Sequence, residues 1–437
     1  MSQSRSFDDI PFVELPPDYQ TDLGPFLART YDRYGPIFRS IFFGDPVVYM
    51  VGPEANRFVL TSQRQAFSHR QGWWQVVELF GDGLLTMDGA EHDEHRRMMN
   101  PAFTISYMDH YLPIMNRIIR QRTADWAERG VVDVYDEARK ITFDVAAEAL
   151  TGLRAGPEVD EFRNIFVQLL NLGMEAADED DYQRRLVQLK GRLYELLLPK
   201  IQERRQHPTN DVLGMLVQAR DDAGQALSDE QLFAHTNILL VAGHETSTSL
   251  VSWLLYLLTL HPDYLQRVLA EQAALFDDLA EPTLEAIKRM KVLENALSEA
   301  ERLYPPVGNG PRGTFEDIEF HGYHVPAGTR VFYSIAASHL IPSIFANPTA
   351  FDPDRFAPPR EEHKKVPYSL VGFGGGPRIC IGTNFAKVEI KAMASQLLRH
   401  YQFELVPDQK IVQLYRGTGM PIQGIKMFVS EKQRVFA

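Results

Sequence analysis

A mainly α-helical fold with small β-sheets is predicted by two features of the sequence. Across residues 107–303 the apolar residues recur at three- and four-residue spacing with few helix breakers. Before and after this block, short runs rich in β-branched and aromatic residues are punctuated by glycine and proline. We therefore expect a helix-rich domain with a long central helix, and β-rich portions toward both ends of the chain.

The first β-rich portion contains a predicted hairpin. Residues 37–43 and 47–51 are strand-like, and Gly44-Asp45-Pro46 separates them. A helix is expected to follow from Pro53. After Pro305 the pattern again becomes short and alternating, which predicts further small sheets.

Two helices are predicted with clear ends. Ser228 followed three residues later by Gln231 fits a capping box, and helical periodicity then continues to His261-Pro262. At roughly 30 residues this helix is well above the usual length in globular proteins. A last amphipathic helix is expected from near Thr383 to about His400, and the chain from Phe403 onward looks extended.

The composition is that of a globular protein with an acidic balance. Lys and Arg number 45 against 58 Asp and Glu, a formal net charge of -13. This balance argues against nucleic acid or an anionic membrane surface as the main partner. Because the sequence shows no internal repeat or Gly/Ser linker, we expect residues 1–437 to form a single domain, and the protein to be a monomer.

The sequence also predicts a cellular location. The opening of the chain carries acids and prolines where a secretory signal needs an unbroken apolar stretch. The most apolar stretch, residues 246–260, is shorter than the roughly 20 apolar residues that span a bilayer. A single cysteine rules out an internal disulfide, which suits a reducing compartment. We expect a cytoplasmic protein without a membrane span.

The single cysteine, Cys380, lies in the run FGGGPRICIG that starts at Phe373. The glycines and the proline forbid regular structure there, and the cysteine directly precedes a predicted helix. Free backbone N–H groups and the positive end of the helix dipole favour a thiolate at this position. Such a thiolate can be a nucleophile, a redox switch or a metal ligand, and Phe373 suits an apolar partner such as a porphyrin.

Other interpretations of this loop agree less well with its residues. A lone cysteine near a helix is often a buried small hydrophobe, but the glycine-rich flanks disfavour that interpretation here. The Gly-x-x-x-x-Gly-Lys spacing of a phosphate loop is missing, and a dinucleotide fingerprint would need a third glycine at Ile379. Nucleotide binding is therefore not expected.

The run AGHETST, residues 242–248, places poor helix formers in the middle of the long helix. Hydroxyl groups there can bond back to the i−4 carbonyl and loosen the helix. A loosened turn could hold water and present Glu245 and Thr246 as a proton relay toward metal-bound oxygen. The alternative is a kinked core helix with a satisfied polar cluster. A zinc-protease motif is excluded, because it would need histidine at Thr248.

Glu299 and Arg302 lie three residues apart on one face of a helix that ends before Pro305. Taken alone, such a pair is usually an ion pair on the surface and contributes little to stability. A second arginine, Arg355, lies in a loop marked by proline. The three residues could therefore form a buried Arg-Glu-Arg cluster that locks the strand region to the cofactor side of the protein.

In order and spacing these motifs resemble those of the cytochrome P-450 superfamily, the haem-thiolate monooxygenases, in its soluble bacterial form. The family's cysteine loop corresponds to Phe373, Gly376, Arg378, Cys380 and Gly382. The family's Ala-Gly-x-Asp/Glu-Thr turn corresponds to Ala242, Gly243, Glu245 and Thr246, its Glu-x-x-Arg pair to Glu299 and Arg302, and its loop arginine to Arg355. The agreement extends from about Tyr34 to Val429, and the cysteine loop is its most specific part.

The resemblance implies haem b, iron protoporphyrin IX, as the cofactor, with Cys380 as the ligand of the iron. It also implies haem contacts from Ala242, Phe373, Gly374, Arg378 and Gly382. His92 and Arg96 stand where the family usually holds a haem propionate, although a solvated charged face would have the same spacing. Arg312 is similar to another propionate-binding arginine, and Arg378 to a third. Several cations are expected because buried propionates without them would carry a large desolvation cost.

The resemblance further implies activation of dioxygen and insertion of one oxygen atom into a hydrophobic small molecule. Hydroxylation or epoxidation of a fatty acid, terpenoid, retinoid or steroid is expected, with Glu245 and Thr246 delivering protons. Electrons should come from a separate ferredoxin or flavodoxin with its reductase, because the chain contains no flavin or iron–sulfur segment. The alternatives are a haem-thiolate peroxygenase or isomerase, and a non-catalytic haem sensor.

The sequence also predicts a substrate pocket and a possible docking face. The substrate pocket should draw on segments 73–85, 166–178, 239–246, 307–311 and 419–422, which are rich in apolar residues and favour a hydrophobic ligand. Four cations near the cysteine loop could form a face that docks an acidic electron donor, or a merely solvated face. These cations are Arg378, Lys387, Lys391 and Arg399.

Overall fold

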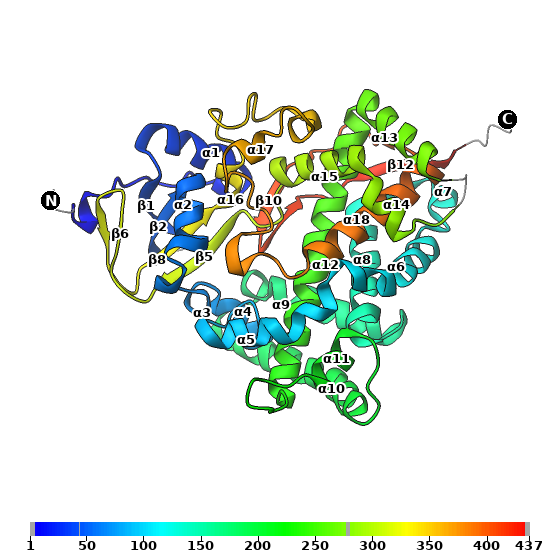
Figure 1. Ribbon diagram of the computed structural model, residues 1–437, viewed down its shortest axis with the longest axis horizontal. Helices are drawn as coiled ribbons and strands as arrows, with labels where there is room; N and C mark the ends of the chain where they lie inside the picture. The colour runs from blue at the N-terminus through cyan, green and yellow to red at the C-terminus, as the bar shows by residue number, and fades with distance from the viewer. Residues whose placement is uncertain (1–4, 43, 277–279, 433–437) are drawn as a thin grey trace.

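The computed structural model describes residues 5–42, 44–276 and 280–432 of the chain. A helix-rich body occupies one side of the molecule and a smaller β-rich part the other, with the chain termini at opposite ends (Figure 1). The predicted fold class, mainly α with small β-sheets, is confirmed.

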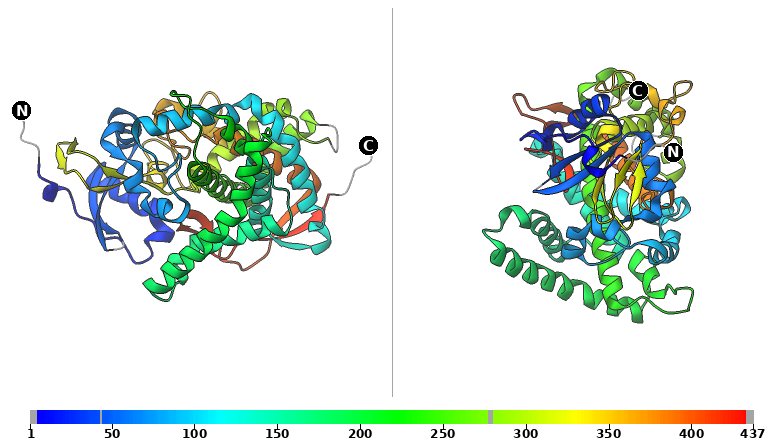
Figure 2. Two further views of the ribbon diagram at one scale, coloured as in Figure 1. Left: turned by 90° about the horizontal axis from the view of Figure 1, so that it is seen from below. Right: turned by 90° about the vertical axis from the view of Figure 1, so that its left-hand side faces the viewer.

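Eleven α-helices within the described residues build the body. They are α5 (Gly89–Met99), α6 (Met108–Thr123), α8 (Val134–Thr151), α9 (Pro157–Glu175), α10 (Glu179–Gln206), α11 (Val212–Gln218), α12 (Asp229–Leu260), α13 (Pro262–Leu275), α14 (Leu284–Arg289), α15 (Lys291–Leu303) and α18 (Thr383–His400). The remaining α-helices are α1 (Tyr19–Tyr34), α2 (Pro53–Arg57), α3 (His69–Gly72), α4 (Trp74–Phe80), α7 (Trp126–Arg129), α16 (Ile335–Ser338) and α17 (Glu362–Lys365). Figure 2 shows α9 and α10 as a helix pair that projects from the body.

Most strands belong to two sheets. A five-stranded sheet has the order β1 (Ile37–Phe42), β2 (Asp45–Val51), β8 (Arg330–Ser334), β5 (Asn309–Thr314), β3 (Phe67–Ser68). In it β2 and β8 are parallel and the other neighbours antiparallel. A three-stranded sheet has the order β4 (Val131–Asp133), β12 (Lys426–Glu431), β9 (Tyr401–Leu405). Two hairpins are formed by β6 (Ile318–Phe320) with β7 (Tyr323–Val325) and by β10 (Gln413–Arg416) with β11 (Thr418–Pro421). The predicted first hairpin is confirmed by β1 and β2, while Phe43 lies outside the described residues.

The central helix α12 forms where the sequence predicts it. Ser228 Oγ accepts the Gln231 backbone N–H at 3.1 Å, and Gln231 Oε1 accepts the Ser228 N–H at 2.9 Å, which completes the capping box. The helix ends at Leu260, before Pro262, and its 32 residues cross the centre of the molecule (Figure 1). Because it is apolar on nearly all sides, it can be stable only as a buried helix.

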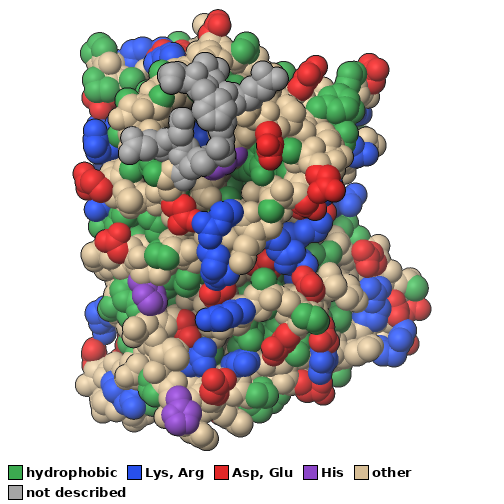
Figure 3. Space-filling view, turned by 90° about the vertical axis from the view of Figure 1, so that its right-hand side faces the viewer, with side chains coloured by type: hydrophobic (Ala, Val, Ile, Leu, Met, Phe, Trp, Pro, Cys, Tyr) green, Lys and Arg blue, Asp and Glu red, His purple; other side chains and the backbone are tan. Residues whose placement is uncertain are grey.

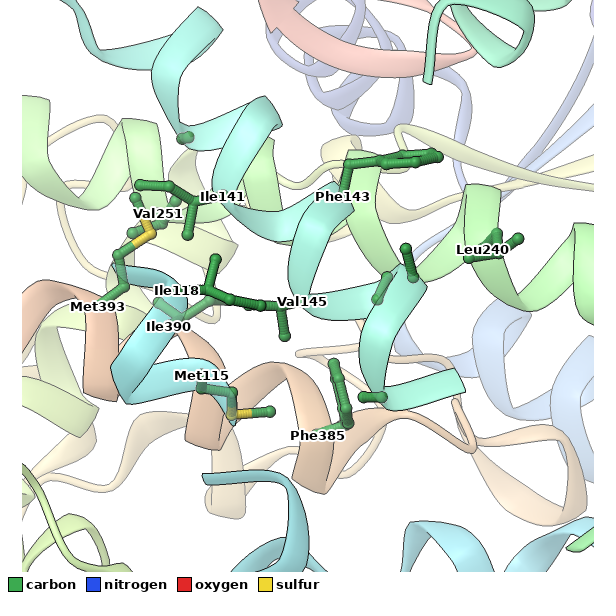
Figure 4. Close-up of a cluster of buried hydrophobic side chains, with 14 of the residues drawn as sticks. Met115, Ile118, Ile141, Phe143, Val145, Leu240, Val251, Phe385, Ile390 and Met393 are labelled. Atoms are coloured by element: carbon green, nitrogen blue, oxygen red, sulfur yellow. The ribbon is translucent and has the colours of Figure 1, made fainter. Parts of the chain in front are cut away.

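The core of the body is built around α12. Figure 4 shows part of it, with Met115 and Ile118 from α6, Ile141, Phe143 and Val145 from α8, Leu240 and Val251 from α12, and Phe385, Ile390 and Met393 from α18. By length and composition α12 is the one helix among the described residues that could cross a membrane, but 72% of its most apolar window is buried inside the protein. A core helix passes the same test, so this is weak evidence for a span.

The surface is mixed in charge where Figure 3 shows it. On the face over α7 and β12, acidic and basic side chains lie interspersed rather than in a continuous patch of one sign.

A buried ionic cluster joins α15 to the 3-10 turn η6 (Pro353–Phe356). Arg302 binds Glu299 through two bonds, Nε to Oε2 at 2.7 Å and Nη2 to Oε1 at 2.8 Å. Arg355 Nε donates to the same Oε1 at 3.1 Å, and all three side chains are inaccessible to solvent. The predicted Arg-Glu-Arg cluster is therefore confirmed.

Replacing Glu299 with glutamine should lower the free energy of unfolding by about 3–5 kcal/mol, because buried Arg302 loses its counter-charge and buried Arg355 keeps only its pairs with Glu362 and Asp352. Chemical denaturation of the haem-loaded protein measures this change. Asp354→Asn is the matched control, since the Arg267–Asp354 pair is 50% and 46% exposed. Its loss should cost less than about 1 kcal/mol. Equal effects of the two substitutions would contradict the role of the buried cluster.

Candidate active site

Cys380 lies at the end of a tight loop that precedes α18. The Cys380 N–H donates to Phe373 O at 2.8 Å and closes the loop. Gly374 and Gly376 have φ values of 74° and 59°, in the left-handed region that favours glycine. A Cβ atom on Gly376 would also lie only 2.7 Å from Thr61 Oγ1. The loop that positions the cysteine therefore depends on glycine at 376.

Glu301, on α15, supports the start of this loop. Its carboxyl group is buried and accepts the backbone N–H groups of Gly372 and Phe373. Burial raises the pKa of Glu301 to about 7, although Lys387 and the two N–H groups oppose that shift. A Cβ atom on Gly372 would collide with the Glu301 carboxyl group.

Cys380 has enough accessible surface to count as an exposed residue. The protein atoms around its thiol nevertheless raise the pKa of the thiol through burial. The two observations agree if the sulfur faces a space inside the protein rather than bulk solvent. The Gly382 N–H, the Thr383 hydroxyl and the Arg96 guanidinium oppose the shift without overcoming it. Burial therefore favours the thiol, and a cation that replaces the proton, as in metal binding, would favour the thiolate expected from the sequence.

One turn of α12 is open although the helix is otherwise largely buried. Ala242 is exposed, and a Cβ atom on Gly243 would find no other atom within 4 Å. Thr246 Oγ1 donates to Ala242 O at 2.7 Å, the i−4 bond considered in the sequence analysis, and α12 continues unbroken through this turn. Since α18 packs against α12, the open turn and Cys380 belong to neighbouring parts of the fold (Figure 1).

Glu245, which we predicted to form a proton relay with Thr246, is held by two side-chain partners. Its Oε1 lies 3.1 Å from Arg139 Nε, on α8, and 3.1 Å from His244 Nε2. Burial raises the pKa of the carboxyl group, but His244 and Arg139 outweigh burial and bring it to about 2. Glu245 is therefore a carboxylate at neutral pH. The sequence did not indicate Arg139, which forms an ion pair with this carboxylate.

Arg312 on β5 and Arg378 in the 3-10 turn η7 (Gly376–Arg378) are buried with little counter-charge. Arg312 has no ion-pair partner among the described residues, and its Nη1 donates to Pro311 O at 2.7 Å. Arg378 Nη2 lies 3.7 Å from Asp88 Oδ1. Burial lowers the pKa of both groups, and burial together with Arg312 lowers that of Arg378 to about 9. This excess of positive charge is what bound carboxylates would neutralise.

His92 and Arg96 lie one turn apart on α5. Burial and Arg378 lower the pKa of His92 to about 4, so its ring is neutral at neutral pH. His92 Nδ1 donates to Asp93 Oδ1 at 3.0 Å, which leaves Nε2 as an acceptor. A bound carboxylate beside Nε2 would therefore favour the protonated ring. Arg96 has no ion-pair partner within the described part of the chain, and its charge acts on Cys380.

His69, the first residue of α3, belongs to the site although no motif in the sequence predicted it. Its ring is buried, and Nδ1 has no hydrogen-bond partner in the described parts of the chain. His69 lines a cavity of about 200 Å³ together with Arg312, Arg378 and Asp88. Burial and the two arginines hold the pKa of His69 well below its usual range. No spacing in the sequence around it points to this site, because only the fold brings it beside the arginines.

The basic docking face predicted near the cysteine loop is wrong in the form expected. Lys391 is 5% exposed, and its Nζ donates to Ile287 O at 2.8 Å. Arg399 Nη2 donates to Ala280 O at 2.9 Å, and Arg378 points inward to the carbonyl groups of residues 84 and 87. Lys387 remains partly exposed beside the Phe373 ring. Helical spacing placed these cations near one another without showing which of them are buried.

The residues of the site fit a haem group. Cys380 offers sulfur to an iron, and a Cβ atom on Gly382 would lie 3.9 Å from that sulfur, so glycine keeps its surroundings open. The open turn of α12 leaves room for a flat ring. The buried cations and the unpartnered His69 Nδ1 suit the two carboxylates at one edge of such a ring.

Fold and site together define a protein of the haem-thiolate class, and comparison with known proteins agrees. The sequence profile described as Cytochrome P450 matches residues 10–429. The chain belongs to the cytochrome P450 family and is a monooxygenase.

Individual relatives cover nearly the whole chain. A protein named putative cytochrome P450 120, from Synechocystis sp., is 35% identical over 89% of this chain and 88% of its own length. A protein from Mycolicibacterium vanbaalenii named sterol 14alpha-demethylase is 28% identical, over 89% of this chain and 88% of its own. The solved structure of retinoic acid bound cyanobacterial CYP120A1 has a TM-score of 0.86 at 32% identity, and covers 97% of this chain and 99% of that chain.

Replacing Gly376 with alanine should lower the free energy of unfolding of the haem-loaded protein by about 1–3 kcal/mol, because the new methyl group adds a collision to an unfavourable φ. Thermal unfolding measures the effect. Gly417→Ala is the matched control, since Gly417 has a φ of 73° but no atom within 4 Å of the place that an added methyl group would take. A loss no larger than that of the control would show that the contact with Thr61 does not matter.

Proposed function

We propose that this monooxygenase binds haem b between Cys380 and the open turn of α12, and that it oxidises a hydrophobic small molecule of retinoid or terpenoid type. The observation that carries the proposal is a single cysteine in a tight glycine loop together with Arg312 and Arg378, which are buried with little counter-charge. A sulfur ligand and carboxylate-binding cations match the chemistry of an iron porphyrin.

Each residue has a defined part in this proposal. Cys380 binds the iron, and Arg96, Arg312 and Arg378 bind the propionates together with His92. The remaining haem contacts come from Ala242, Phe373, Gly374 and Gly382. When bound, the haem supplies the oxygen-activating chemistry, while the residues of this chain hold it, exclude water and deliver protons.

Proton delivery falls first to Thr246. Its hydroxyl group lies on the open turn of α12, and donation to Ala242 O leaves its oxygen free to accept a hydrogen bond. Glu245 joins the relay when its contact with Arg139 opens, since the closed pair holds it as a carboxylate.

The substrate class is supported by the relatives. The retinoic acid bound cyanobacterial structure and the sterol 14alpha-demethylase are both named for ligands with apolar carbon skeletons. The segments expected to line the pocket of this chain are also rich in apolar residues. A retinoid carboxylic acid is the first candidate, ahead of other terpenoids, steroids and fatty acids.

Oxygen activation by haem also needs a source of electrons. We assign this role to a separate ferredoxin or flavodoxin with its reductase, with the 437-residue chain acting as one haem domain, a monomer of the cytoplasm. Among the cations first considered for docking, Lys387 and Arg399 are partly exposed while Lys391 is buried, so the docking surface must also use other residues.

Reduced protein treated with carbon monoxide should show the red-shifted Soret band of thiolate-bound haem, and Cys380→Ala should abolish it because the sulfur ligand is lost. Ile379→Ala, at a neighbouring side chain that is 45% exposed, should keep the band. Titration of the unmodified ferric protein with retinoic acid should shift its spectrum as ligand displaces water. A band typical of nitrogen-ligated iron that survives in Cys380→Ala would refute the assignment of the ligand.

Thr246→Ala should leave haem content unchanged while a larger share of electrons is lost to peroxide or water instead of product. The reason is that the hydroxyl group on the open turn no longer delivers protons. The ratio of product formed to NAD(P)H consumed measures this coupling, and Thr246→Ser should restore much of it. Thr259→Ala is the control, because Thr259 makes the same i−4 bond, to Leu255 O at 2.8 Å, near the end of α12. Unchanged coupling in Thr246→Ala would remove Thr246 from the relay.

A further inference from the structure

Two buried histidines join α5 to the first half of α12. His95 Nδ1 and His235 Nε2 are 2.7 Å apart, and the side chains are 6% and 1% exposed. The family motifs in this sequence include neither residue. A direct hydrogen bond between two buried imidazoles requires that one ring donates and the other accepts.

The hydrogen-bond pattern assigns the tautomer of each ring. The Leu84 backbone N–H donates to His235 Nδ1 at 3.1 Å, so this nitrogen carries no proton. His235 is then protonated on Nε2 and donates to His95 Nδ1, and His95 carries its own proton on Nε2. The pattern links the Leu84 amide to α5 through one continuous chain of bonds, and it holds only while His95 is neutral.

The loop of residues 81–86, which contains Leu84, is pressed tightly against α12. A Cβ atom on Gly81 would lie 3.0 Å from Ala234 Cβ, and one on Gly83 would lie 3.0 Å from Ile238 Cδ1. Inside the loop the Thr86 hydroxyl donates to Asp82 Oδ1 at 2.6 Å. The 81–86 loop therefore has a compact shape of its own and is attached to α12 by close glycine contacts and by His235.

This attachment lies beside the proposed pocket. The 81–86 loop overlaps the segment 73–85 that is expected to line it, and Ile238 lies one turn of α12 before the exposed Ala242. A shift of the loop away from α12 would change the wall of the pocket without touching Cys380.

We propose that His95 and His235 are positioning residues that hold the 81–86 loop closed over the substrate pocket, and that uptake of a proton by His95 releases the loop. The inference rests on the proposed function only in taking this loop as a wall of the pocket. Protonated His95 would turn its Nδ1–H toward the Nε2–H of His235, so that two donors face each other and the link to Leu84 breaks.

The surrounding charges set the direction of the pH dependence. Burial lowers the pKa of His95, and the nearby acids Glu91, Glu94, Asp221 and Asp82 oppose that shift. Burial and His95 lower the pKa of His235 to about 3. Arg70 neutralises part of the acidic surroundings, with its Nη2 at 2.5 Å from Asp82 and 2.9 Å from Glu91. Since the closed loop lowers the proton affinity of both rings, the closed form is favoured above the ordinary histidine pKa of about 6.5 and weakens as the pH falls below it.

Hydrogen exchange of the haem-loaded protein tests the proposal without any substrate. After correction for intrinsic rates, the amides of residues 81–86 should exchange about tenfold faster at about pH 5.5 than at about pH 7.5, since one buried hydrogen bond is worth about that factor. His95→Asn keeps an acceptor near the position of Nδ1 and cannot be protonated, so its loop should stay protected at both pH values. His235→Leu removes the link and should exchange fast at both.

The exposed His110 provides the control, because His110→Asn should behave like the unmodified protein. Two outcomes would overturn the proposal. One is equal protection of the loop at both pH values in the unmodified protein, and the other is an unchanged pH dependence in His95→Asn. The second outcome remains decisive even if His235→Leu does not fold.

Retinoic acid titrations then separate this inference from the proposed function. If retinoic acid gives no spectral shift at any pH, its assignment as a substrate fails while the exchange result stands. If it binds, its affinity should fall with acidification in the unmodified protein and not in His95→Asn.

Discussion

Positive charge buried with little counter-charge beside the cysteine loop is the constraint on which the site depends. Burial lowers the pKa of Arg312 and of Arg378, and the charge of Arg312 lowers the pKa of Arg378 further. The Cys380 thiol has the opposite problem, because burial makes its anion unfavourable. A group that carries an iron at its centre and carboxylates at its edge relieves both conditions at once. Folding and cofactor binding should therefore be thermodynamically linked in this protein.

Local signals explain which parts of the fold could be predicted. The capping box of α12, the bounds of α18 and the first hairpin all depend on residues within a few positions of one another, and all three are confirmed. The basic docking face failed for the converse reason. Lys391 and Arg399 follow a helical spacing that indicates a shared face. Only packing against other elements decides that Lys391 turns inward to the Ile287 carbonyl group and that Arg399 binds the carbonyl group of the exposed Ala280.

The site residues that belong to motifs could likewise be predicted from the sequence. The cysteine loop has a spacing specific enough to be recognised, whereas the spacing of Glu299 and Arg302 alone occurs in many helices. The structure joins this pair to Arg355 in one buried cluster. His69 and Arg139 were missed, because they approach Arg378 and Glu245 from distant parts of the chain and carry no motif of their own. The ion pair with Arg139 helps to keep Glu245 in its carboxylate form and binds that carboxylate to a guanidinium group. Tertiary partners, more than residue identity, thus decide what an acid in this helix can do.

The contact between Glu301 and Gly372 has an evolutionary consequence. The Glu301 carboxyl group occupies the volume that any side chain at position 372 would need, and it also binds the backbone on either side of that point. The two positions are therefore expected to co-vary among descendants of this chain. A larger residue at 372 becomes acceptable only in lineages that have first shortened the side chain at 301, so the order of the two changes is constrained.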